Sequence, residues 1–188
     1  PNQGGTMNNN VIFSLYREFV KRDFSTLRFN FRGVGKSQGS YDDGEGELTD
    51  AASAMDWIQT QNPSATHCWV AGFSFGSWIG MQLMMRRPEI KGFISLSAPA
   101  LTRDFAFLAP CPSSGLFIHG SDDEIVPSLA LTRVLEKISI QKGAVIKDII
   151  IQGADHFFND HNNEMIDAVG KYLDTRLDKD GNFISNHE

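Results

Sequence analysis

Ser74 lies between two glycines in the stretch WVAGFSFGSWIG, which covers residues 69–80. The pattern Gly72-Phe73-Ser74-Phe75-Gly76 has the form G-x-S-x-G, and it follows an unbroken apolar run that is typical of a strand buried on both faces. A helical pattern begins immediately after it. A serine on a sharp turn between a strand and a helix has its hydroxyl exposed, as a nucleophile requires. We interpret the glycines as positions where side chains would collide with neighbouring chain in so tight a turn.

The motif is weak on its own, because glycine and serine are common residues and a chain of this length contains it by chance about once in fifteen times. Its position between an expected strand and an expected helix is what favours the nucleophilic interpretation. The alternative is that Ser74 only caps the helix that follows, since serine is a preferred residue at helix N-termini. A base and an acid in suitable positions of the sequence would favour the nucleophile over the helix cap.

A serine hydroxyl needs a base within hydrogen-bond distance before it becomes a good nucleophile. Among the five histidines, His156 follows the last expected strand, at the carboxyl edge of a parallel sheet where ligands bind. His67 begins the strand that Ser74 ends, and it therefore belongs to the opposite edge of the sheet. His119 precedes a glycine turn and is interpreted as a packed structural residue, while His161 is a weaker alternative. We therefore predict that His156 is the base.

An acid that orients the base is expected after the preceding strand. Two adjacent carboxylates, Asp122 and Asp123, follow the expected strand that ends near His119. Either of them gives the chain order serine, acid, histidine, which differs from the orders of chymotrypsin and subtilisin. Position alone does not separate the two, because one of two adjacent carboxylates must point away from the histidine. Both are therefore candidates at this point.

These residues predict acyl transfer through a covalent intermediate. The aspartate would orient and charge-stabilise His156, His156 would take the proton of Ser74, and the serine oxygen would attack a carbonyl carbon. The oxyanion that forms needs two preorganised N–H donors. One is expected from the backbone of Phe75, and the second from the loop before the first helix, where Asn2 and Gln3 lie. This chemistry requires no metal and no other cofactor, and we expect none.

A second glycine motif, GVGKS at residues 33–37, ends in the Gly-Lys-Ser triplet of a phosphate-binding loop. The full motif needs a glycine five positions before Gly35, and Asn30 stands there. No helical pattern follows Ser37, so no helix N-terminus is available to bind a phosphate. We therefore predict that this segment is an ordinary loop and that the protein binds no nucleotide.

The chain of 188 residues suits one domain with a single sizeable core. It has 17 basic and 23 acidic residues and a formal net charge of −6, which argues against a nucleic-acid or anionic-membrane partner. No apolar run is long enough to span a bilayer, and no signal peptide is evident. The two cysteines have no metal-ligand spacing and indicate reduced thiols. These features favour a cytoplasmic protein.

Strand and helix patterns alternate along the chain, which is typical of parallel strands joined by crossover helices on both faces of a sheet. Helical periodicity is found over residues 8–21, 48–58, 75–87, 128–138 and 164–177. Strand patterns are found over residues 25–31, 67–73, 90–97, 115–119 and 145–151. We predict a single α/β domain over residues 1–177, followed by a polar tail over residues 178–188. The first helix lacks a preceding strand, which indicates an N-terminally incomplete domain.

Several longer segments resemble the α/β-hydrolase superfamily, and within it the small bacterial α/β hydrolases related to dienelactone hydrolases. These segments have the same order as in that group and are distributed over nearly the whole chain. They are GGTMNN (4–9), LRFNFRGVG (27–35), GFSFG (72–76), LAPCPSSG (108–115), HG (119–120) with Asp123 and VP (126–127), and GADHFF (153–158).

The resemblance implies an α/β-hydrolase fold with a mostly parallel sheet, whose first strands would lie upstream of Pro1. It implies a serine hydrolase that acts on small carboxylic esters or thioesters. It also points to Asp123 over Asp122 as the acid, because the family places its acid four residues after the histidine of His-Gly-x-x-Asp. The expected catalytic set is therefore Ser74, Asp123 and His156.

Only 16 residues, Ala98–Ser113, join two expected core strands at the usual position of a lid domain, so we predict a lidless pocket for a small-molecule acyl substrate. A homodimer is compatible with the sequence. Two other functions stay open, a non-catalytic binding protein with the same fold and a serine peptidase, because a fold does not fix a function. Six phenylalanines are candidates for the pocket lining, with core packing as the alternative for each: Phe73, Phe75, Phe105, Phe107, Phe157 and Phe158.

Overall fold

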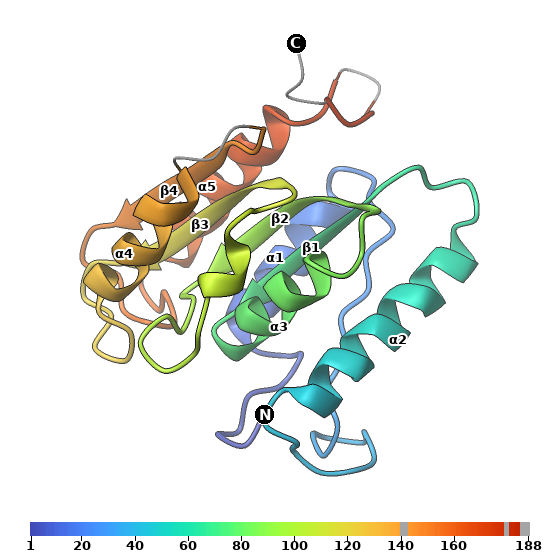
Figure 1. Ribbon diagram of the computed structural model, residues 1–188, viewed down its shortest axis with the longest axis horizontal. Coiled ribbons are helices and arrows are strands. Elements are labelled where there is room, and N and C mark those ends of the chain that lie inside the picture. Colours follow the sequence, from blue (N-terminus) through green and yellow to red (C-terminus); the bar gives the residue numbers. More distant parts are fainter. Residues whose placement is uncertain (140–142, 179–180, 185–188) are drawn as a thin grey trace.

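The computed structural model describes residues 1–139, 143–178 and 181–184 (Figure 1). Its centre is a sheet of four parallel strands whose order in space, β1-β2-β3-β4, is also their order in the sequence. The strands are β1 (Cys68–Phe73), β2 (Ile90–Leu96), β3 (Ser114–Gly120) and β4 (Ile146–Ile151). Because the strands are parallel, all four end at the same edge of the sheet, and the residues that follow them gather there.

In the described part of the chain, five α-helices cover both faces of this sheet (Figure 1). They are α1 (Asn10–Val20), α2 (Glu45–Gln61), α3 (Phe75–Met84), α4 (Ser128–Ser139) and α5 (Asn162–Asp174). Helices α1 and α5 pack on one face, and α2, α3 and α4 lie on the other. No helix among the described residues has the length and apolar character to cross a membrane. The predicted α/β architecture is confirmed, with element ends that differ from the prediction by a few residues.

The two central strands are buried on both faces because their side chains alternate between two cores. In β3, Leu116 and Ile118 belong to the core formed with α1 and α5, whereas Phe117 belongs to the core formed with α2, α3 and α4. Phe117 meets Phe93 of β2 edge to face, with ring centroids 5.2 Å apart. The unbroken apolar runs of the sequence therefore reflect strands without a solvent-exposed face, as in other parallel sheets.

Residues 25–31 do not form the strand that their side chains predicted. Residues 24–31 and β1 instead line a common groove of about 1090 Å³. A strand is stable only when its backbone N–H and C=O groups pair with those of a neighbouring strand. No strand in the described ranges pairs with residues 25–31, so their β-forming side chains do not produce one.

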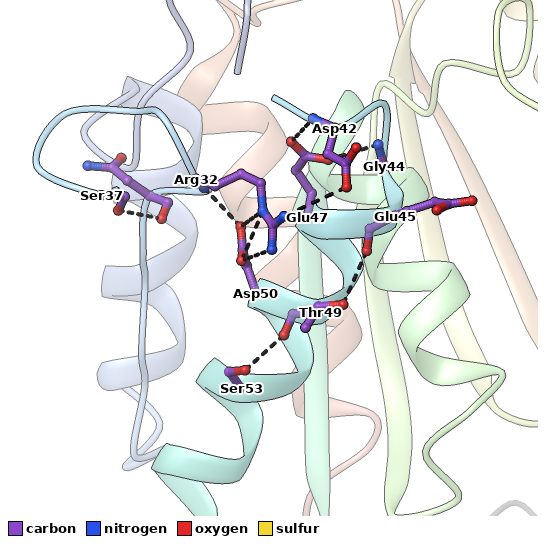
Figure 2. A network of polar contacts seen from close by, with 10 residues as sticks. Arg32, Ser37, Asp42, Gly44, Glu45, Glu47, Thr49, Asp50 and Ser53 are labelled. Atoms are coloured by element: carbon purple, nitrogen blue, oxygen red, sulfur yellow. Dashed lines mark hydrogen bonds and ion pairs between the residues drawn. The ribbon is translucent and has the colours of Figure 1, made fainter. Parts of the chain in front are cut away.

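A network of charged and polar residues fixes the loop that precedes α2 (Figure 2). Arg32 donates from Nη2 to Oδ1 of Asp50 at 2.8 Å and from Nε to Oδ2 at 3.1 Å. Burial acts to raise the pKa of the Asp50 carboxyl, but the hydrogen bonds from Arg32 outweigh it and hold that pKa below its ordinary value. The buried Glu47 carboxylate accepts the backbone N–H groups of Asp42 at 3.0 Å and Gly44 at 2.8 Å. These bonds cap α2, which begins earlier than the apolar periodicity predicted.

The connection between β2 and β3 contains no lid domain. Within these residues, all of which the structure describes, the regular structure is one short 3₁₀ turn, Ala106–Leu108. Phe105 and Leu108 are buried in the core with α3 and α4 and anchor the loop there. The predicted absence of a lid is confirmed.

The chain after α5 returns to the first residues of β1. Leu177 forms an isolated antiparallel bridge with Phe183. The Phe183 ring lies 6.0 Å from the Trp69 ring, and the Arg176 guanidinium lies 4.9 Å from the centre of the same Phe183 ring. The predicted polar tail therefore contains an apolar anchor within its described residues.

Candidate active site

Ser74 lies on the turn between β1 and α3, at the edge of the sheet where the strands end. Its backbone angles are φ 50° and ψ −119°, a positive-φ conformation that residues with side chains rarely adopt. The Ser74 N–H donates to the C=O of Leu96 at 2.8 Å, which ties the turn to β2. The serine side chain makes no capping hydrogen bond to α3, a helix that is described throughout. The turn therefore has the strained geometry of a nucleophile elbow, and the simple N-cap interpretation is wrong.

The two glycines of the motif have different environments. A Cβ on Gly72 would lie 2.4 Å from the carbonyl oxygen of Gly76, so a side chain at this position would force the turn apart. A Cβ on Gly76 would meet no described atom within 4 Å apart from those of its chain neighbours and its own helix backbone. Close approach of the backbone therefore explains Gly72, whereas the predicted collision at Gly76 is wrong because that position faces open space.

Gly72→Ala is expected to lower the free energy of unfolding by about 2–3 kcal/mol, because a methyl group pressed against backbone atoms strains the turn. Gly76→Ala is the matched control, and it is expected to be neutral or to stabilise by up to about 1 kcal/mol, since alanine favours helix over glycine. Urea unfolding followed by circular dichroism measures both. Equal effects of the two substitutions would contradict this account of the turn.

Three side chains that are distant in the sequence form a continuous chain of hydrogen bonds at this edge. Ser74 Oγ lies 3.0 Å from Nε2 of His156, and Nδ1 of His156 lies 2.7 Å from Oδ2 of Asp123. The histidine and the aspartate are each only 5% exposed. A carboxylate only accepts hydrogen bonds, so the ring proton belongs on Nδ1, and Nε2 is left to accept from the serine hydroxyl. In such an arrangement an imidazole can remove the hydroxyl proton.

The backbone around Asp123 determines which of the two adjacent aspartates faces the histidine. Oδ1 of Asp123 accepts the N–H groups of Ile125 at 2.9 Å and Val126 at 2.7 Å, so both carboxylate oxygens are held in place. Asp122 is exposed, and its Oδ1 accepts the hydroxyl of Ser121 at 2.7 Å instead. The structure therefore brings Asp123, and not Asp122, to the imidazole.

The loops that follow β3 and β4 are bonded to each other, which fixes the distance between the carboxylate and the imidazole. The N–H of Asp122 donates to the C=O of Ala154 at 3.0 Å, and the N–H of Gly153 donates to Ser121 Oγ at 2.8 Å. A Cβ on Gly120 would lie 2.0 Å from the Ala154 carbonyl oxygen. Glycine at position 120 therefore allows the two loops to approach this closely.

The other described histidines make no hydrogen bond with the serine. His119 is buried, and its Nδ1 lies 3.5 Å from Oδ1 of Asp148. Burial lowers the pKa of His119, although the carboxylates of Asp148 and Asp123 act to raise it. His161 directly precedes α5, and His67 directly precedes β1 at the opposite edge of the sheet. His156 is therefore the imidazole that the fold brings to the elbow.

Phe75 is the first residue of α3, and its backbone N–H directly follows the elbow serine. The first N–H groups of a helix have no acceptor within the helix, so this donor is available to a ligand oxygen. Asn2 and Gln3 are exposed and border the same groove as Ser74. The contribution of a second N–H donor by one of them stays a prediction.

Aromatic and charged residues that no sequence motif indicated surround Phe75. The Arg103 guanidinium lies 4.6 Å from the centre of the Trp78 ring and 5.7 Å from that of Phe75. The same group donates to the Tyr41 hydroxyl at 2.8 Å and to Oδ1 of Asp43 at 2.7 Å. The loop before α2 thus meets the loop after β2 beside the elbow. Such loop residues follow no periodicity, so the sequence contains no signal for them.

Three of the six candidate phenylalanines line the groove, and the other three pack in or against the two cores. Phe73, Phe75 and Phe157 border the groove together with Ser74 and His156. The rings of Phe73 and Phe157 lie 5.2 Å and 5.1 Å from the imidazole ring. They give the region beside the serine an apolar surface. Phe105 and Phe158 are buried in the cores, and Phe107 is half-buried against the core that contains Phe105.

The GVGKS segment at residues 33–37 has the structure of an ordinary loop. Seven non-helical residues, 38–44, separate it from α2, and Ser37 Oγ donates to the C=O of Asn30 at 2.9 Å (Figure 2). The described residues also contain no group of three or more His, Cys, Asp and Glu side chains arranged to hold a metal ion.

Comparisons with known proteins give a family that fits this geometry. A model of the family described as serine aminopeptidase, S33, matches residues 3–142. An uncharacterized protein of Rickettsia prowazekii is 46% identical over 175 residues, which cover 91% of this chain and 74% of that protein. The narrower resemblance to dienelactone hydrolases stays a prediction.

Two solved structures are similar over most of both chains. A protein of unknown function from Agrobacterium tumefaciens is 53% identical with a TM-score of 0.92, covering 94% of this chain and 81% of that one. An α/β serine hydrolase without a lid from Xanthomonas campestris is 31% identical with a TM-score of 0.84, covering 93% of this chain and 77% of that one. With the family match over residues 3–142, these likenesses show that the chain belongs to the serine aminopeptidase S33 family of the α/β-hydrolase superfamily.

Proposed function

We propose that this protein is a serine hydrolase that cleaves small carboxylic esters or thioesters through an acyl-enzyme intermediate. The observation that carries the proposal is the hydrogen-bond chain from Ser74 through His156 to Asp123, which begins on a strained turn. Backbone strain of this kind costs about 1–3 kcal/mol, and it clusters at functional sites. Family membership supports hydrolase chemistry in general, and these three residues support its serine form.

In the proposed reaction, Nε2 of His156 takes the Ser74 proton as Oγ forms a bond to the substrate carbonyl carbon. The carbonyl electron pair moves to oxygen, and the N–H of Phe75 donates to the resulting oxyanion. Return of this electron pair breaks the bond to the alcohol or thiol, which leaves with the proton from Nε2. Asp123 stabilises the imidazolium throughout. Water then loses a proton to Nε2, attacks the acyl carbon and releases the carboxylic acid, and the serine regains its proton.

A second donor to the oxyanion is proposed from the loop before α1, with Asn2 or Gln3 as its source. Both residues border the groove that contains Ser74, and both precede α1, which begins at Asn10. A preorganised pair of donors is worth more than one, because removal of a single donor lowers kcat by about 10²–10³-fold in other serine hydrolases.

The groove favours esters over peptides with a free amino terminus. An aminopeptidase has to bind the substrate ammonium group, and a carboxylate is the natural partner for it. Asp23 supplies the one carboxylate among the described residues that line the groove. It directly precedes Phe24, whose ring packs 6.3 Å from the ring of Trp69 near the beginning of β1, at the opposite edge of the sheet from Ser74. Beside the elbow the lining charge is the Arg103 guanidinium, which is paired with Asp43, so this distribution of charge supports an acyl group without an ammonium group beside the nucleophile.

The open groove and its apolar lining support a small acyl substrate. With no lid between β2 and β3 in the described chain, the surface near the serine is provided by the elbow, the loop after β4 and the loops that carry Tyr41 and Arg103. The rings of Phe73 and Phe157 contact the imidazole, and we propose that they also contact the acyl chain.

The test uses a fluorophosphonate probe followed by a substrate panel. We expect one probe molecule per protein, located by mass spectrometry on the peptide that contains Ser74. The panel compares p-nitrophenyl acyl esters and acyl thioesters with aminoacyl p-nitroanilides, and each reaction is followed by the absorbance of its own product: p-nitrophenolate, a thiol trapped with a disulfide reagent, or p-nitroaniline. We expect kcat/KM for short acyl esters to exceed that for the anilides by about 10²-fold or more, which corresponds to about 2.7 kcal/mol in transition-state free energy.

Three other outcomes would contradict the proposal in different ways. A folded protein without an adduct at Ser74 would remove the nucleophile from the mechanism. Labelling without turnover across the panel would favour a binding protein with the same fold. Faster cleavage of the anilides than of the esters would make the protein a serine peptidase.

A further inference from the structure

The loop that carries His156 has to cross the end of the sheet. β1, which leads to Ser74, and β4, which leads to His156, are the two outer strands of the four-stranded sheet. Adjacent strands lie about 4.8 Å apart, so the ends of these two strands are separated by about 14 Å. The imidazole Nε2 nevertheless lies 3.0 Å from the serine Oγ. The chain after β4 therefore runs back over the ends of β3 and β2.

This crossing loop is bonded to each strand end that it passes. At the end of β3, the N–H of Gly153 donates to Ser121 Oγ at 2.8 Å. At the end of β2, Ser97 Oγ donates to the C=O of His156 at 2.9 Å. The second of these bonds acts on the main chain of the histidine itself, at the point where its side chain turns toward the serine.

Ser97 is buried, with 1% of its surface exposed, and its φ angle is 46°. A positive φ is uncommon for a residue with a side chain, and it persists only where the surrounding structure imposes it. The Ser97 N–H donates to the C=O of Ile118 at 2.9 Å, which fixes the residue to β3. Its neighbour Leu96 accepts the N–H of Ser74 at 2.8 Å. Two consecutive residues at the end of β2 thus hold the main chains of both Ser74 and His156.

We infer that Ser97 is a positioning residue, which holds the main chain of His156 so that Nε2 stays within hydrogen-bond distance of Ser74. The inference rests on the proposed hydrolase function, since the reaction is what makes the place of the imidazole matter. Ser97 acts through the histidine and touches no substrate. Misplacement of a reacting group by 1 Å lowers rates by about 10²-fold, so the loss of this one hydrogen bond has a measurable effect on turnover.

Two substitutions separate the hydrogen bond from the backbone strain. Ser97→Ala removes the hydroxyl and keeps the strained conformation, whereas Ser97→Gly removes the hydroxyl and relieves the strain. Both are expected to lower kcat for a p-nitrophenyl ester by about 10- to 100-fold while KM stays within about twofold, because binding does not depend on the imidazole. Rates are expressed per active site, counted by the end point of fluorophosphonate labelling, so that unfolded protein does not contribute.

Ser113→Ala is the matched control. Ser113 is also buried, and its hydroxyl also donates to a backbone carbonyl, that of Ile90 at 2.7 Å. This bond lies at the beginning of β2 and β3, at the opposite edge of the sheet from the elbow. We expect Ser113→Ala to lower Tm as much as Ser97→Ala does, and to leave kcat and KM unchanged.

The outcomes distinguish this inference from the proposed function. If the wild type hydrolyses esters and both position-97 variants keep its kcat, Ser97 does not position the base, and the function stands. If Ser97→Gly recovers the rate that Ser97→Ala loses, strain and not the hydrogen bond is responsible, and the inference is overturned. A loss of kcat in Ser113→Ala as large as in Ser97→Ala would also overturn it. A wild type without a Ser74 adduct and without turnover ends the proposed function and this inference with it.

Discussion

Ser74→Ala is expected to lower kcat for ester hydrolysis by a factor of about 10⁶, because the acyl-enzyme cannot form without the hydroxyl. His156→Ala is expected to have an effect of similar size, since the hydroxyl 3.0 Å from Nε2 loses its base. The double substitution is expected to cause no further loss, because residues that act as a unit are not additive. The kcat of each of the three variants is measured by steady-state hydrolysis of a p-nitrophenyl ester.

His161→Ala is the matched histidine control for this experiment. His161 lies at the N-terminus of α5, five positions after His156. In the described part of the chain it makes no hydrogen bond with Ser74. Its replacement is expected to leave kcat unchanged. Circular dichroism is expected to show the wild-type fold for Ser74→Ala, since this substitution removes one oxygen and keeps the backbone conformation. A Ser74→Ala protein that keeps most of the wild-type rate would contradict the proposed mechanism.

Asp123→Asn is expected to lower kcat by about 10³–10⁴-fold, because it moves the ring proton of His156 from Nδ1 to Nε2. Oδ1 of Asp123 accepts the N–H groups of Ile125 and Val126, so the asparagine carbonyl oxygen is expected to take that place. Its NH₂ group then faces Nδ1 of His156, which has to accept a hydrogen bond there and carry its proton on Nε2. A protonated Nε2 cannot accept the proton of Ser74.

Asp122→Asn is the control for the adjacent carboxylate. Asp122 is exposed and accepts the hydroxyl of Ser121 at 2.7 Å, so its replacement is expected to leave kcat within about twofold of the wild type, as for most exposed positions. KM is expected to stay constant in both variants. A larger loss in Asp122→Asn than in Asp123→Asn would show that the acid has been assigned to the wrong residue.

The proximity of Ser74 and His156 was predictable for two reasons. Each residue follows a recognisable strand pattern in the sequence, and the parallel topology brings the ends of those strands to one edge of the sheet. The G-x-S-x-G pattern follows an apolar run that fits a buried strand, and the histidine follows the last strand of the alternation. Parallel strands bring their carboxyl ends to one edge, so the two side chains are neighbours without any knowledge of the loops.

The choice between Asp122 and Asp123 was not predictable from position, and it required a family resemblance. The two residues differ by one step along a loop, and no periodicity sets which of two adjacent side chains faces inward. The structure makes the choice through the backbone N–H groups of Ile125 and Val126, whose directions depend on the loop conformation.

The errors of sequence reasoning have equally physical causes. Residues 25–31 have β-forming side chains, but pairing depends on a neighbouring strand and not on the segment itself. Gly76 belongs to the same motif as Gly72, yet a Cβ there would point into open space. Ser97 gave no signal at all, because one serine at a strand end is common and its positive φ follows from contacts with distant residues.

Because β1 and β4 are the outer strands of the described sheet, the proposed catalytic set is complete only when all four strands are paired. The first three strands and the loop after β3 carry Ser74 and Asp123, whereas His156 comes only after β4. In the proposed mechanism the imidazole therefore reaches the serine only when β4 has docked on β3 and its loop has crossed back to β1. Local opening of β4 would stop the reaction while the other three strands stay paired.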